Sequence, residues 1–508
     1  MKHYDVAIIG LGPVGSFTAL LLEKYGLNVL AIDKEKDIYQ LPRAVTISDQ
    51  GFRMAQLVDI EEIYLNNSTE LGGMSFVDGN LDLIGGSIDL EGLITANGWP
   101  PSRMFHQPFT DKAIRERLND SKVTILLESE LKNIKNGEDR VEIHIKDANS
   151  EENSYCTCNY LIGSDGGSSE VRKLLKITQK DLEYNRDWVV IDVELNGKNR
   201  LSEKALQVCD SERLATYIPA HLPYRRWEFI IHEHEDKREF LDDKKVQGLI
   251  GKWLEPDEYK IIRKAVYQFH SVIADNFRKG NCFLIGDAAH QAPPFMGEGM
   301  MSGYRDAVNL SWKIALTIKN QLEEDLLDSY EIERKPHSEF VVKNSAGIGE
   351  LMDAYARFEN PSEVPKELVQ KGYGSFILPD LNKGFFYGGK ADSSMGAGQI
   401  FPQPVEYIDN AIIERMDKIF GKGFSLVSMD KIDLSLEEEN FLKELECNLV
   451  ILEDIFVANN PWLKSFMQLG DVFVIRPDRY VYGSSNESVT VQMLLEDLKK
   501  KVKGINTD

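Results

Sequence analysis

GNCFLIGDAAHQAPPFMGEGMMSGYRDAVNLSWKIALTIK, residues 280–319, is the stretch that decides the fold class of this chain. Its apolar run at 282–285 is typical of a buried strand, and apolar residues recur at helical spacing from 300 to 315. Between them, Gly286-Asp287 leaves a carboxylate where the strand ends, and a loop rich in proline and glycine follows. Open α/β sheets hold their ligands at the carboxyl ends of their strands, so we expect a ligand beside Asp287.

The loop that follows Asp287 suits a negatively charged ligand. Gly297 and Gly299 allow backbone N–H groups to approach a ligand closely, and the start of the helix offers unpaired donors with a partial positive charge. A reduced flavin, which carries negative charge on its ring, would fit there. The stretch by itself is equally compatible with a strand-loop-helix crossover that binds nothing, because such crossovers often contain glycine and proline.

The N-terminal sequence favours the interpretation that residues 280–319 contribute to a ligand site. Residues 5–10 form an apolar strand, GLGPVG occupies 10–15, and a helix and a second strand lead to Asp33. In such a strand-helix-strand unit, the glycines of GxGxxG permit a tight turn and close approach of a pyrophosphate, and the acid binds a ribose 2′-hydroxyl. The pattern therefore predicts a dinucleotide site, and the acid favours FAD or NAD over NADP.

A third acid follows a strand end. Asp165 comes directly after the apolar residues 160–163 and precedes two glycines. Three acids at strand ends, Asp33, Asp165 and Asp287, indicate one large cofactor that is contacted from distant parts of the chain. Arg43, just beyond the second strand, either reaches this cofactor or lies on the surface.

Composition limits the class of partner. The chain has 508 residues, enough for two or three domains, with 42% hydrophobic and 28% charged residues and a formal net charge of −23. This charge argues against nucleic acid or an anionic membrane as the main partner. No apolar run approaches the length of a membrane span, and a strand begins at Tyr4, so neither a membrane anchor nor a signal peptide is expected.

Cysteine usage indicates a cytoplasmic protein with reduced thiols. The five cysteines are an odd and sparse set. Cys156 and Cys158 lie two residues apart, but no second cluster of cysteine or histidine accompanies them, so no metal site is expected.

The predicted fold class is α/β, and the pattern divides the chain into five parts. A first part of a cofactor-binding domain covers 1–180, a β-rich insertion that walls a substrate pocket covers 181–275, and the second part of the cofactor domain covers 276–375. A loop-rich linker at 376–404 leads to a small α/β unit at 405–508. The charged helix after residue 320 is expected to present a solvated face and to bend or break at Pro336.

Three motifs together resemble the class A flavoprotein aromatic hydroxylases, which have the p-hydroxybenzoate hydroxylase fold. They are GxGxxG at 10–15, DGxxSxVR at 165–172 and GDAAH at 286–290. PPFMGEGMMSGYRDAVNLSWKIA and RRWEF resemble in particular the branch of 3-(3-hydroxyphenyl)propionate hydroxylase and its relatives. The family usually has Gly-Gln-Gly where this chain has Gly297-Glu298-Gly299.

The resemblance implies a Rossmann-like FAD-binding domain with an inserted antiparallel sheet and a thioredoxin-like C-terminal domain, here without a CxxC pair. It assigns Asp33 to the ADP half of FAD, Asp287 to the ribityl chain, Asp165 to FAD and NAD(P)H, and the backbone at 299–301 to the flavin ring. The implied FAD-contacting residues are Gly10, Gly12, Pro13, Val14, Gly15, Asp33, Lys34, Arg43, Gln107, Asp165, Gly286, Asp287, Pro294, Gly297, Gly299, Met300 and Met301.

The resemblance also implies a monooxygenase. NADH or NADPH would reduce FAD, O₂ would give a flavin C4a-hydroperoxide, and one oxygen would enter a phenolic ring, ortho to its hydroxyl. Tyr217 and His232 on the insertion are candidate bases, and Arg225 or Arg226 could bind an acidic substrate; each residue also fits an ordinary packed or surface position. A homodimer is compatible with the pattern.

Other functions fit the same motifs. A flavin oxidase or reductase, or a hydroxylase of polycyclic rings, would share them, and a non-catalytic flavin-binding protein is a more distant alternative. A flavin halogenase is disfavoured because the six tryptophans never lie two residues apart.

Overall fold

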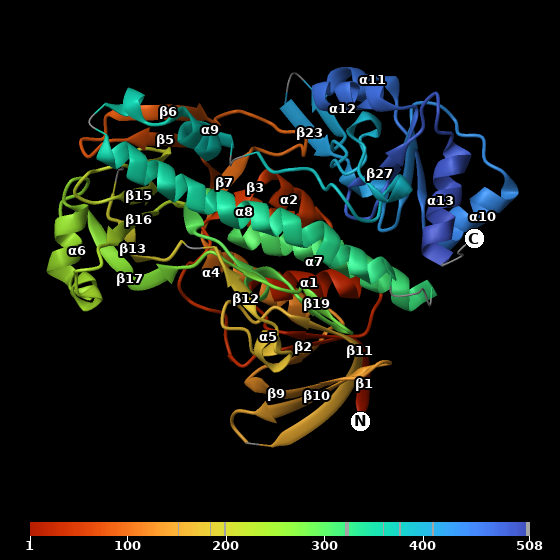
Figure 1. Ribbon diagram of the computed structural model, residues 1–508, viewed down its shortest axis with the longest axis horizontal. Coiled ribbons are helices and arrows are strands. Elements are labelled where there is room, and N and C mark those ends of the chain that lie inside the picture. The colour runs from red at the N-terminus through yellow and green to blue at the C-terminus, as the bar shows by residue number, and fades with distance from the viewer. Residues whose placement is uncertain are drawn as a thin grey trace.

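The computed structural model describes residues 1–150, 152–182, 184–197, 200–320, 325–358, 360–374, 377–408 and 411–503. A mixed sheet, called the central sheet below, carries the GxGxxG turn and lies in the lower part of the view (Figure 1). Its path runs β19-β20-β11-β1-β2-β8, and β11 also pairs with a hairpin of β9 and β10. β1 pairs in parallel with both β2 and β11, so the strand ends that bear Asp33 and Asp165 flank the turn. The bounds are β1 (Lys2–Ile9), β2 (Val29–Ile32), β8 (Thr124–Leu126), β9 (Ser129–Asn136), β10 (Val141–Asp147), β11 (Asn153–Gly163), β19 (Arg278–Lys279) and β20 (Cys282–Leu284).

Helices cover this sheet. α1 (Pro13–Lys24) packs against α7 (Gly299–Asn320), and the rings of Phe17 and Tyr304 stack at 4.1 Å between centroids. Burial of apolar side chains from the strands and these helices forms the largest core of the chain. The other helices near this sheet are α2 (Asp49–Gln56), α3 (Glu61–Asn66), α4 (Gln107–Asn119) and α5 (Glu170–Leu174).

A seven-stranded sheet forms the second layer, in the order β17-β13-β16-β15-β14-β5-β6. The predicted range 181–275 is too narrow for it, because β5 and β6 come from residues 73–89 and β5 pairs in parallel with β14. Pairing between such distant segments leaves no local trace in the sequence. The bounds are β5 (Gly73–Val77), β6 (Leu83–Asp89), β13 (Arg186–Leu195), β14 (Ala205–Val208), β15 (Ala215–Ile218), β16 (Tyr224–Ile231) and β17 (Tyr259–Phe269), with α6 (Asp243–Ile250) beside them.

The chain also forms two small three-stranded sheets. One has the order β3-β7-β4 and the other β12-β18-β21. Their bounds are β3 (Thr46–Ser48), β4 (Ser68–Glu70), β7 (Ser102–Phe105), β12 (Gln179–Asp181), β18 (Val272–Ala274) and β21 (His290–Gln291).

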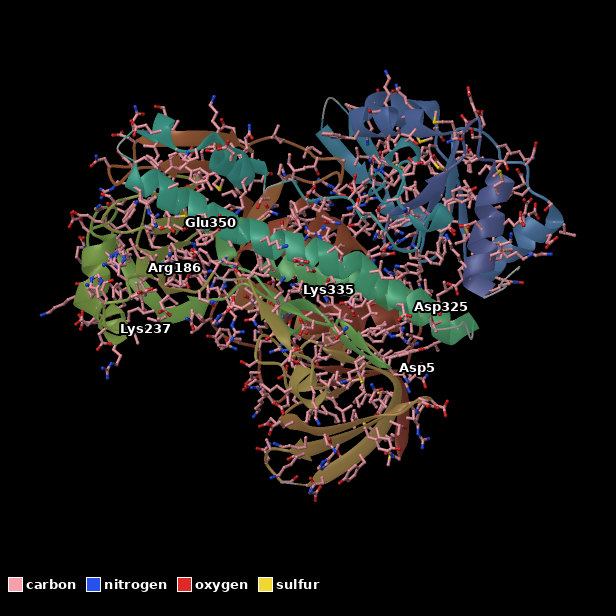
Figure 2. All side chains as sticks on the ribbon, in the orientation of Figure 1. Asp5, Arg186, Lys237, Asp325, Lys335 and Glu350 are labelled. Atoms are coloured by element: carbon pink, nitrogen blue, oxygen red, sulfur yellow. The ribbon has the colours of Figure 1, made fainter. Side chains whose placement is uncertain are left out.

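The long helix α8 (Asp325–Arg357) runs from the C-terminal unit to the seven-stranded sheet, where α9 (Lys366–Gly374) packs on it (Figure 1). Figure 2 labels Asp325, Lys335 and Glu350 along its length. The helix continues through Pro336, so the predicted break at this residue does not occur.

The prediction that the charges of this helix form a solvated face is wrong for two of its residues. Glu333 and Arg334 are only 2% and 1% exposed, because neighbouring elements supply partners of opposite charge. Glu333 binds Lys313 of α7 at 2.8 Å and Arg476 of the C-terminal unit at 2.8 Å. Tertiary packing therefore buries part of the charged helix face in ion pairs that connect α8 to α7 and to the C-terminal unit.

The C-terminal unit contains a four-stranded sheet in the order β25-β24-β26-β27, flanked by helices. β24 and β25 are parallel and the other pairs are antiparallel. The thioredoxin-like assignment stays a prediction. The bounds are β22 (Val405–Ile408), β23 (Ala411–Arg415), β24 (Ser425–Ser428), α10 (Leu436–Glu444), β25 (Asn448–Ile451), α11 (Asp454–Asn459), α12 (Pro461–Phe466), β26 (Val472–Ile475), β27 (Val481–Ser484) and α13 (Val491–Lys503).

The loop-rich segment before this unit is packed rather than free. Phe386 and Phe401 are fully buried, and Gln403 donates a hydrogen bond to Gln56 at 2.7 Å. The described part of the predicted linker at 376–404 therefore belongs to the core that joins the C-terminal unit to the rest.

All five cysteines are free thiols, and four of them are buried. Within the described ranges, no cluster of three or more His, Cys, Asp or Glu could hold a metal ion. A search of the described helices finds none with the length and apolar character needed to cross a membrane.

Candidate active site

A cavity of about 1740 Å³ lies between the central sheet and the seven-stranded sheet. It extends from the β1–α1 turn and the end of β2, past the 285–300 loop, to one face of β14, β15 and β16. Ligand pockets usually measure about 300–1,000 Å³, so this space suits a large cofactor together with a substrate.

The β1–α1 turn forms one end of the cavity. Gly10 has φ +96°, and a Cβ there would lie 2.6 Å from the carbonyl oxygen of Ser164, so only glycine fits. A Cβ on Gly12 would instead meet no atom within 4 Å. Gly12 caps α1 without a side-chain hydrogen bond, which leaves the N–H groups of the first turn available to a phosphate.

Asp33 is held in place at the end of β2. Its carboxylate accepts hydrogen bonds from the backbone N–H of Leu11 at 2.6 Å and of Glu35 at 2.8 Å. Arg115 of α4 donates to the carbonyl of Leu11 at 2.9 Å and also lines the cavity. The acid therefore couples the end of β2 to the glycine-rich turn and stays within reach of a ligand, as does the exposed neighbouring Lys34.

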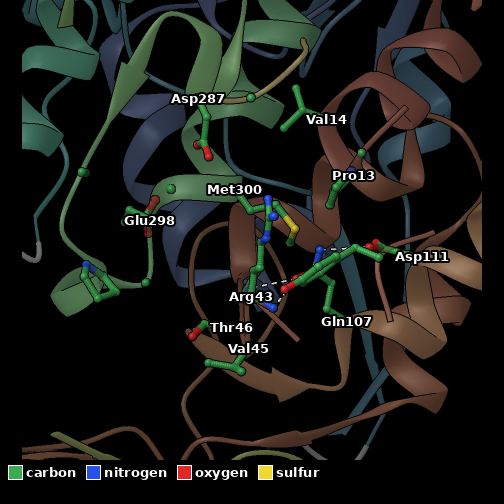
Figure 3. A pocket seen from close by; sticks show the side chains of 18 of the residues that line it. Pro13, Val14, Arg43, Val45, Thr46, Gln107, Asp111, Asp287, Glu298 and Met300 are labelled. Carbon is green, nitrogen blue, oxygen red and sulfur yellow. Dashed lines mark hydrogen bonds between the residues drawn. The ribbon is translucent and has the colours of Figure 1, made fainter. Parts of the chain in front are cut away.

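Gln107 positions the loop that carries Arg43. Its Oε1 accepts hydrogen bonds from the backbone N–H groups of Arg43 and Ala44 at 2.8 and 2.7 Å, and its Nε2 donates to Asp111 at 2.9 Å (Figure 3). Burial raises the pKa of Asp111 to about 7, against the lowering effects of Gln107 and Arg115. Both amide atoms of Gln107 are thus used within the protein.

Arg226 holds the same loop from the opposite side. Its guanidinium donates to the carbonyls of Pro42 and Arg43 at 2.6 and 2.8 Å and pairs with Asp192 at 2.7 Å. Arg226 lines the cavity, and each of its three side-chain nitrogens donates a hydrogen bond within the protein. Its partners identify it as a support for Arg43 rather than as a free cation.

The carboxylate of Asp165 forms its hydrogen bonds within the protein. Its carboxylate accepts hydrogen bonds from Ser169 Oγ at 2.5 Å and from the first backbone N–H groups of α5. Arg172 of α5 then donates to the carbonyl of Gly167 and to that of Ala288, both at 2.8 Å. The DG and GD motifs are thereby tied together at the cavity edge.

Asp287 differs from the other two acids because its carboxylate accepts no hydrogen bond from the described residues. Figure 3 shows it pointing into the cavity, on the side of Arg43. The side chain is accessible from the cavity but lies deep in the protein, and this desolvation raises the pKa of its carboxyl, against the opposing charges of His290 and Arg43. An acceptor placed in this way fits a hydroxyl-bearing chain.

The loop beyond Asp287 leads to the N-terminus of α7. Gly297 has φ +68°, and a Cβ on Gly299 would meet no atom within 4 Å, so the backbone is open to the cavity. Glu298, which replaces the glutamine usual in the family, pairs with Arg305 at 2.7 Å. This pairing neutralises the added charge beside the loop.

Three of the predicted cofactor residues do not line the cavity. Gly15 packs against the Gly10 carbonyl, Gly286 packs near Val14 with φ +57°, and the fully buried Met301 lies near Gly51 of α2. They shape the turns behind the cavity. Those that line it are Gly10, Gly12, Pro13, Val14, Asp33, Lys34, Arg43, Gln107, Asp165, Asp287, Pro294, Gly297, Gly299 and Met300.

The two candidate bases also lie elsewhere. Tyr217 is 1% exposed, donates to the carbonyl of Ser202 at 2.8 Å and packs on Trp227, on the face of β15 opposite to the cavity. His232 lies beyond β16, with Nε2 3.1 Å from the carbonyl oxygen of Glu212. Neither residue is placed to take a proton from a ligand in the cavity.

Arg225 is likewise absent from the cavity wall. It is fully buried and donates to the carbonyls of Ala220 and Tyr224 at 2.8 and 2.9 Å. Successive residues of a strand face opposite sides, so Arg226 and Glu228 share the cavity face while Arg225 does not. The same alternation could have identified Glu228 within RRWEF. In contrast, no local sequence pattern identifies Arg115 as a residue that lines the cavity.

The residues present fit FAD. Open backbone at Gly12 suits a pyrophosphate, Asp33 suits a ribose, the unpaired carboxylate of Asp287 suits ribityl hydroxyls, and the open N-terminus of α7 suits an electron-rich ring.

Comparison with known proteins agrees with this fit. The family described as "FAD binding domain" matches residues 3–345. The chain is 26% identical over 521 residues to 3-(3-hydroxy-phenyl)propionate/3-hydroxycinnamic acid hydroxylase 2 of Burkholderia vietnamiensis, covering 95% of this chain and 94% of that protein. A similarly named hydroxylase of Shigella sonnei is 29% identical over 444 residues, covering 83% of this chain and 77% of that protein.

Solved structures show the same fold. OxyS anhydrotetracycline hydroxylase from Streptomyces rimosus superposes with a TM-score of 0.78 at 21% identity, covering 98% of this chain and 99% of that one. The flavin-dependent monooxygenase PieE, in complex with FAD and substrate, gives a TM-score of 0.80 at 16% identity with the same coverage. From its motifs, its cavity and the match over most of its length, the chain belongs to the family of flavoproteins with this FAD-binding domain.

Proposed function

We propose that this protein is an FAD-dependent monooxygenase that hydroxylates a phenolic ring with NADH or NADPH and O₂. The observation that carries the proposal is one continuous cavity that joins the FAD-fitting end to a face of the seven-stranded sheet with both apolar and polar side chains. The names of the relatives support an aromatic substrate, and 3-(3-hydroxyphenyl)propionate is the first compound to test.

The residues of this chain would bind the cofactor and the substrate, orient them and enclose them. When bound, FAD would supply the redox chemistry, accepting hydride from NAD(P)H and activating O₂ for transfer to the ring. Asp287 and the N-terminus of α7 would hold the flavin end, and Gln107 and Arg226 would keep Arg43 in place beside it. Apolar side chains around the ring would exclude water.

A separate Rossmann domain for NADH or NADPH is not needed for this reaction. The chain has a single GxGxxG, so NADH or NADPH would approach the flavin transiently and would not occupy a Rossmann site of its own. We propose Arg43 as one contact for the incoming nicotinamide dinucleotide, because it lies at the cavity wall and carries a positive charge.

The experiment uses the purified holoenzyme. The visible spectrum shows whether FAD is bound, and NADH and NADPH oxidation with O₂ uptake are followed with and without a panel of phenols, with products analysed by mass. Substrate-dependent oxidation with a product one oxygen heavier supports the hydroxylase. Oxidation without oxygenation of any phenol indicates a flavin oxidase or reductase, and a protein that cannot be loaded with FAD contradicts the proposal.

A further inference from the structure

A second, smaller cavity lies where the ends of α1 and α2 meet the C-terminal unit, apart from the cavity that fits FAD. We call it the junction cavity. Its volume is about 190 Å³, and the segments 21–25, 56–57, 417–422 and 477–479 line it. A single water needs about 10–15 Å³ of such space, so the junction cavity has room for a molecule of several heavy atoms.

Lysines surround the open side of the junction cavity. Lys24 and Lys418 both pair with Asp59, at 2.8 and 3.1 Å, so one acid serves two cations. Glu61 acts on Lys418 from beyond ion-pair distance. Lys422 pairs with no acid of the described residues, and its Nζ donates a hydrogen bond to the carbonyl of Lys24 at 2.9 Å. Part of this positive charge offsets the partial negative charge at the end of α1.

The same excess of cations continues in the buried wall. Asp417 is 1% exposed and binds Arg53 at 2.8 Å and Arg479 at 2.9 Å, so again two cations share one acid. Counted over the ion pairs, each of these two groups leaves one positive charge in excess, and Lys422 adds a third. Such a concentration of positive charge, in a chain whose formal net charge is −23, attracts an anion.

Two neutral donors at the junction cavity have no partner within the described part of the chain. Gln56 is 6% exposed, and its Oε1 accepts hydrogen bonds from Trp99 at 3.1 Å and from Gln403 at 2.7 Å. Its amide nitrogen and the hydroxyl of Tyr25 form no hydrogen bond with the described residues, and both residues line the cavity. A buried donor without a partner is costly unless a ligand supplies an acceptor. Capping of a helix end explains the lysines but does not explain these two donors.

The donor set fits a small oxyanion with two negative charges. Ammonium, amide and hydroxyl groups from three separate segments all donate hydrogen bonds, and charge-assisted hydrogen bonds to an oxyanion are the stronger kind. Asp417, the only acid that lines the junction cavity, is covered by Arg53 and Arg479. The three positive charges in excess can therefore balance a dianion.

We propose that the junction cavity binds a phosphate dianion, either free phosphate or the phosphate group of a small monoester. The anion contacts the ends of α1 and α2 together with the C-terminal unit, so its binding stabilises the folded chain against unfolding. This site is separate from the cavity that fits FAD and does not depend on the reaction that occurs there.

The test measures binding of inorganic phosphate by calorimetric titration of the FAD-saturated protein, in which FAD fills the phosphate-fitting turn at Gly12. The reference is sodium chloride at equal ionic strength. We expect one phosphate per chain and a rise in the unfolding temperature with phosphate but not with chloride. Glycerol 3-phosphate separates the two sources: tighter binding than that of phosphate indicates a phosphorylated metabolite, and equal or weaker binding indicates free phosphate.

Two variants remove different parts of the site. K418Q/K422Q removes two of the three excess charges, and Y25F removes only the hydroxyl without a partner. We expect each to raise the Kd of phosphate about tenfold, because a hydrogen bond or an attraction to a charged group is lost. Y25F should leave the stability of the phosphate-free protein unchanged, so a defect in folding would not explain its weaker binding. The matched control is K464Q, on the exposed surface of the C-terminal unit and outside the junction cavity.

Three outcomes would overturn the proposal. The first is a wild-type protein that binds no phosphate. The second is an unchanged Kd in both K418Q/K422Q and Y25F, which would place the phosphate in another part of the molecule. The third is a loss of affinity in K464Q as large as that in the double variant, which would indicate attraction to the surface as a whole rather than a built site.

Discussion

The Oδ2 atom of Asp306 lies 3.0 Å from the backbone nitrogen of Gly286, so a carboxylate on α7 holds the turn that carries Asp287. Asp306 is fully buried and also binds His290 at 2.7 Å and Arg334 at 2.9 Å. Burial alone would raise the pKa of Asp306, but His290 and Arg334 lower it below its ordinary value. The cavity-facing acid Asp287 thus depends on a second acid that does not line the cavity.

Removing the charge of Asp306 should weaken the fold. D306N leaves Arg334 buried beside a neutral amide, and breaking such a pair costs about 3–5 kcal/mol. We expect a loss of this order in the free energy of unfolding, measured by urea denaturation of the FAD-free protein. D325N, at the exposed start of α8, is the control and should leave the midpoint unchanged. Equal midpoints for D306N and wild type would contradict the role assigned to this acid.

Replacing Asp287 should affect the affinity for FAD and not the stability, in contrast to D306N. Because its carboxylate accepts no hydrogen bond from the described residues, D287A should leave the stability of the FAD-free protein nearly unchanged. Hydrogen bonds to a charged group contribute about 1.5–3 kcal/mol, so the Kd for FAD should rise about 10- to 100-fold. Titration by flavin fluorescence measures this affinity. An unchanged Kd would remove Asp287 from the cofactor site.

Two glycines of one motif should respond differently to alanine. In G10A, the new Cβ would lie 2.6 Å from the Ser164 carbonyl oxygen at φ +96°, and we expect a loss of stability above about 1 kcal/mol. In G12A, the Cβ enters open cavity space, so stability should hold while FAD affinity falls. Urea denaturation and FAD titration of both variants check this, and a stable, FAD-binding G10A would contradict the described turn.

The C-terminal unit should unfold together with the rest of the chain in one cooperative transition. Arg476 and Glu333 form a buried pair at 2.8 Å, and Asp478 accepts a hydrogen bond from Trp312 of α7 at 3.1 Å. R476A leaves Glu333 with Lys313 as its remaining cation, and we expect about 3–5 kcal/mol of destabilisation. Thermal unfolding should show one transition in the wild type. Two well-separated transitions would contradict this coupling.

The sequence by itself determined the glycine-rich turns and the acids that follow strands β2 and β20. The glycines at 10, 12 and 15, the acid at 33 and the Gly286-Asp287 turn are short-range features, because a tight turn or a helix N-terminus needs particular residues within a few positions. Comparison with known proteins confirmed the flavoprotein family and FAD on this basis.

Only the tertiary structure decided the substrate end. Whether Tyr217 or its neighbours face the cavity depends on strand pairing, and residues 73–89 join the sheet through β5 and β14, far apart in the chain. The buried partners of Glu333 and Asp306 likewise come from other elements of the chain. Pairings of this kind depend on burial and on opposite charges brought together by the whole fold, so no local pattern encodes them.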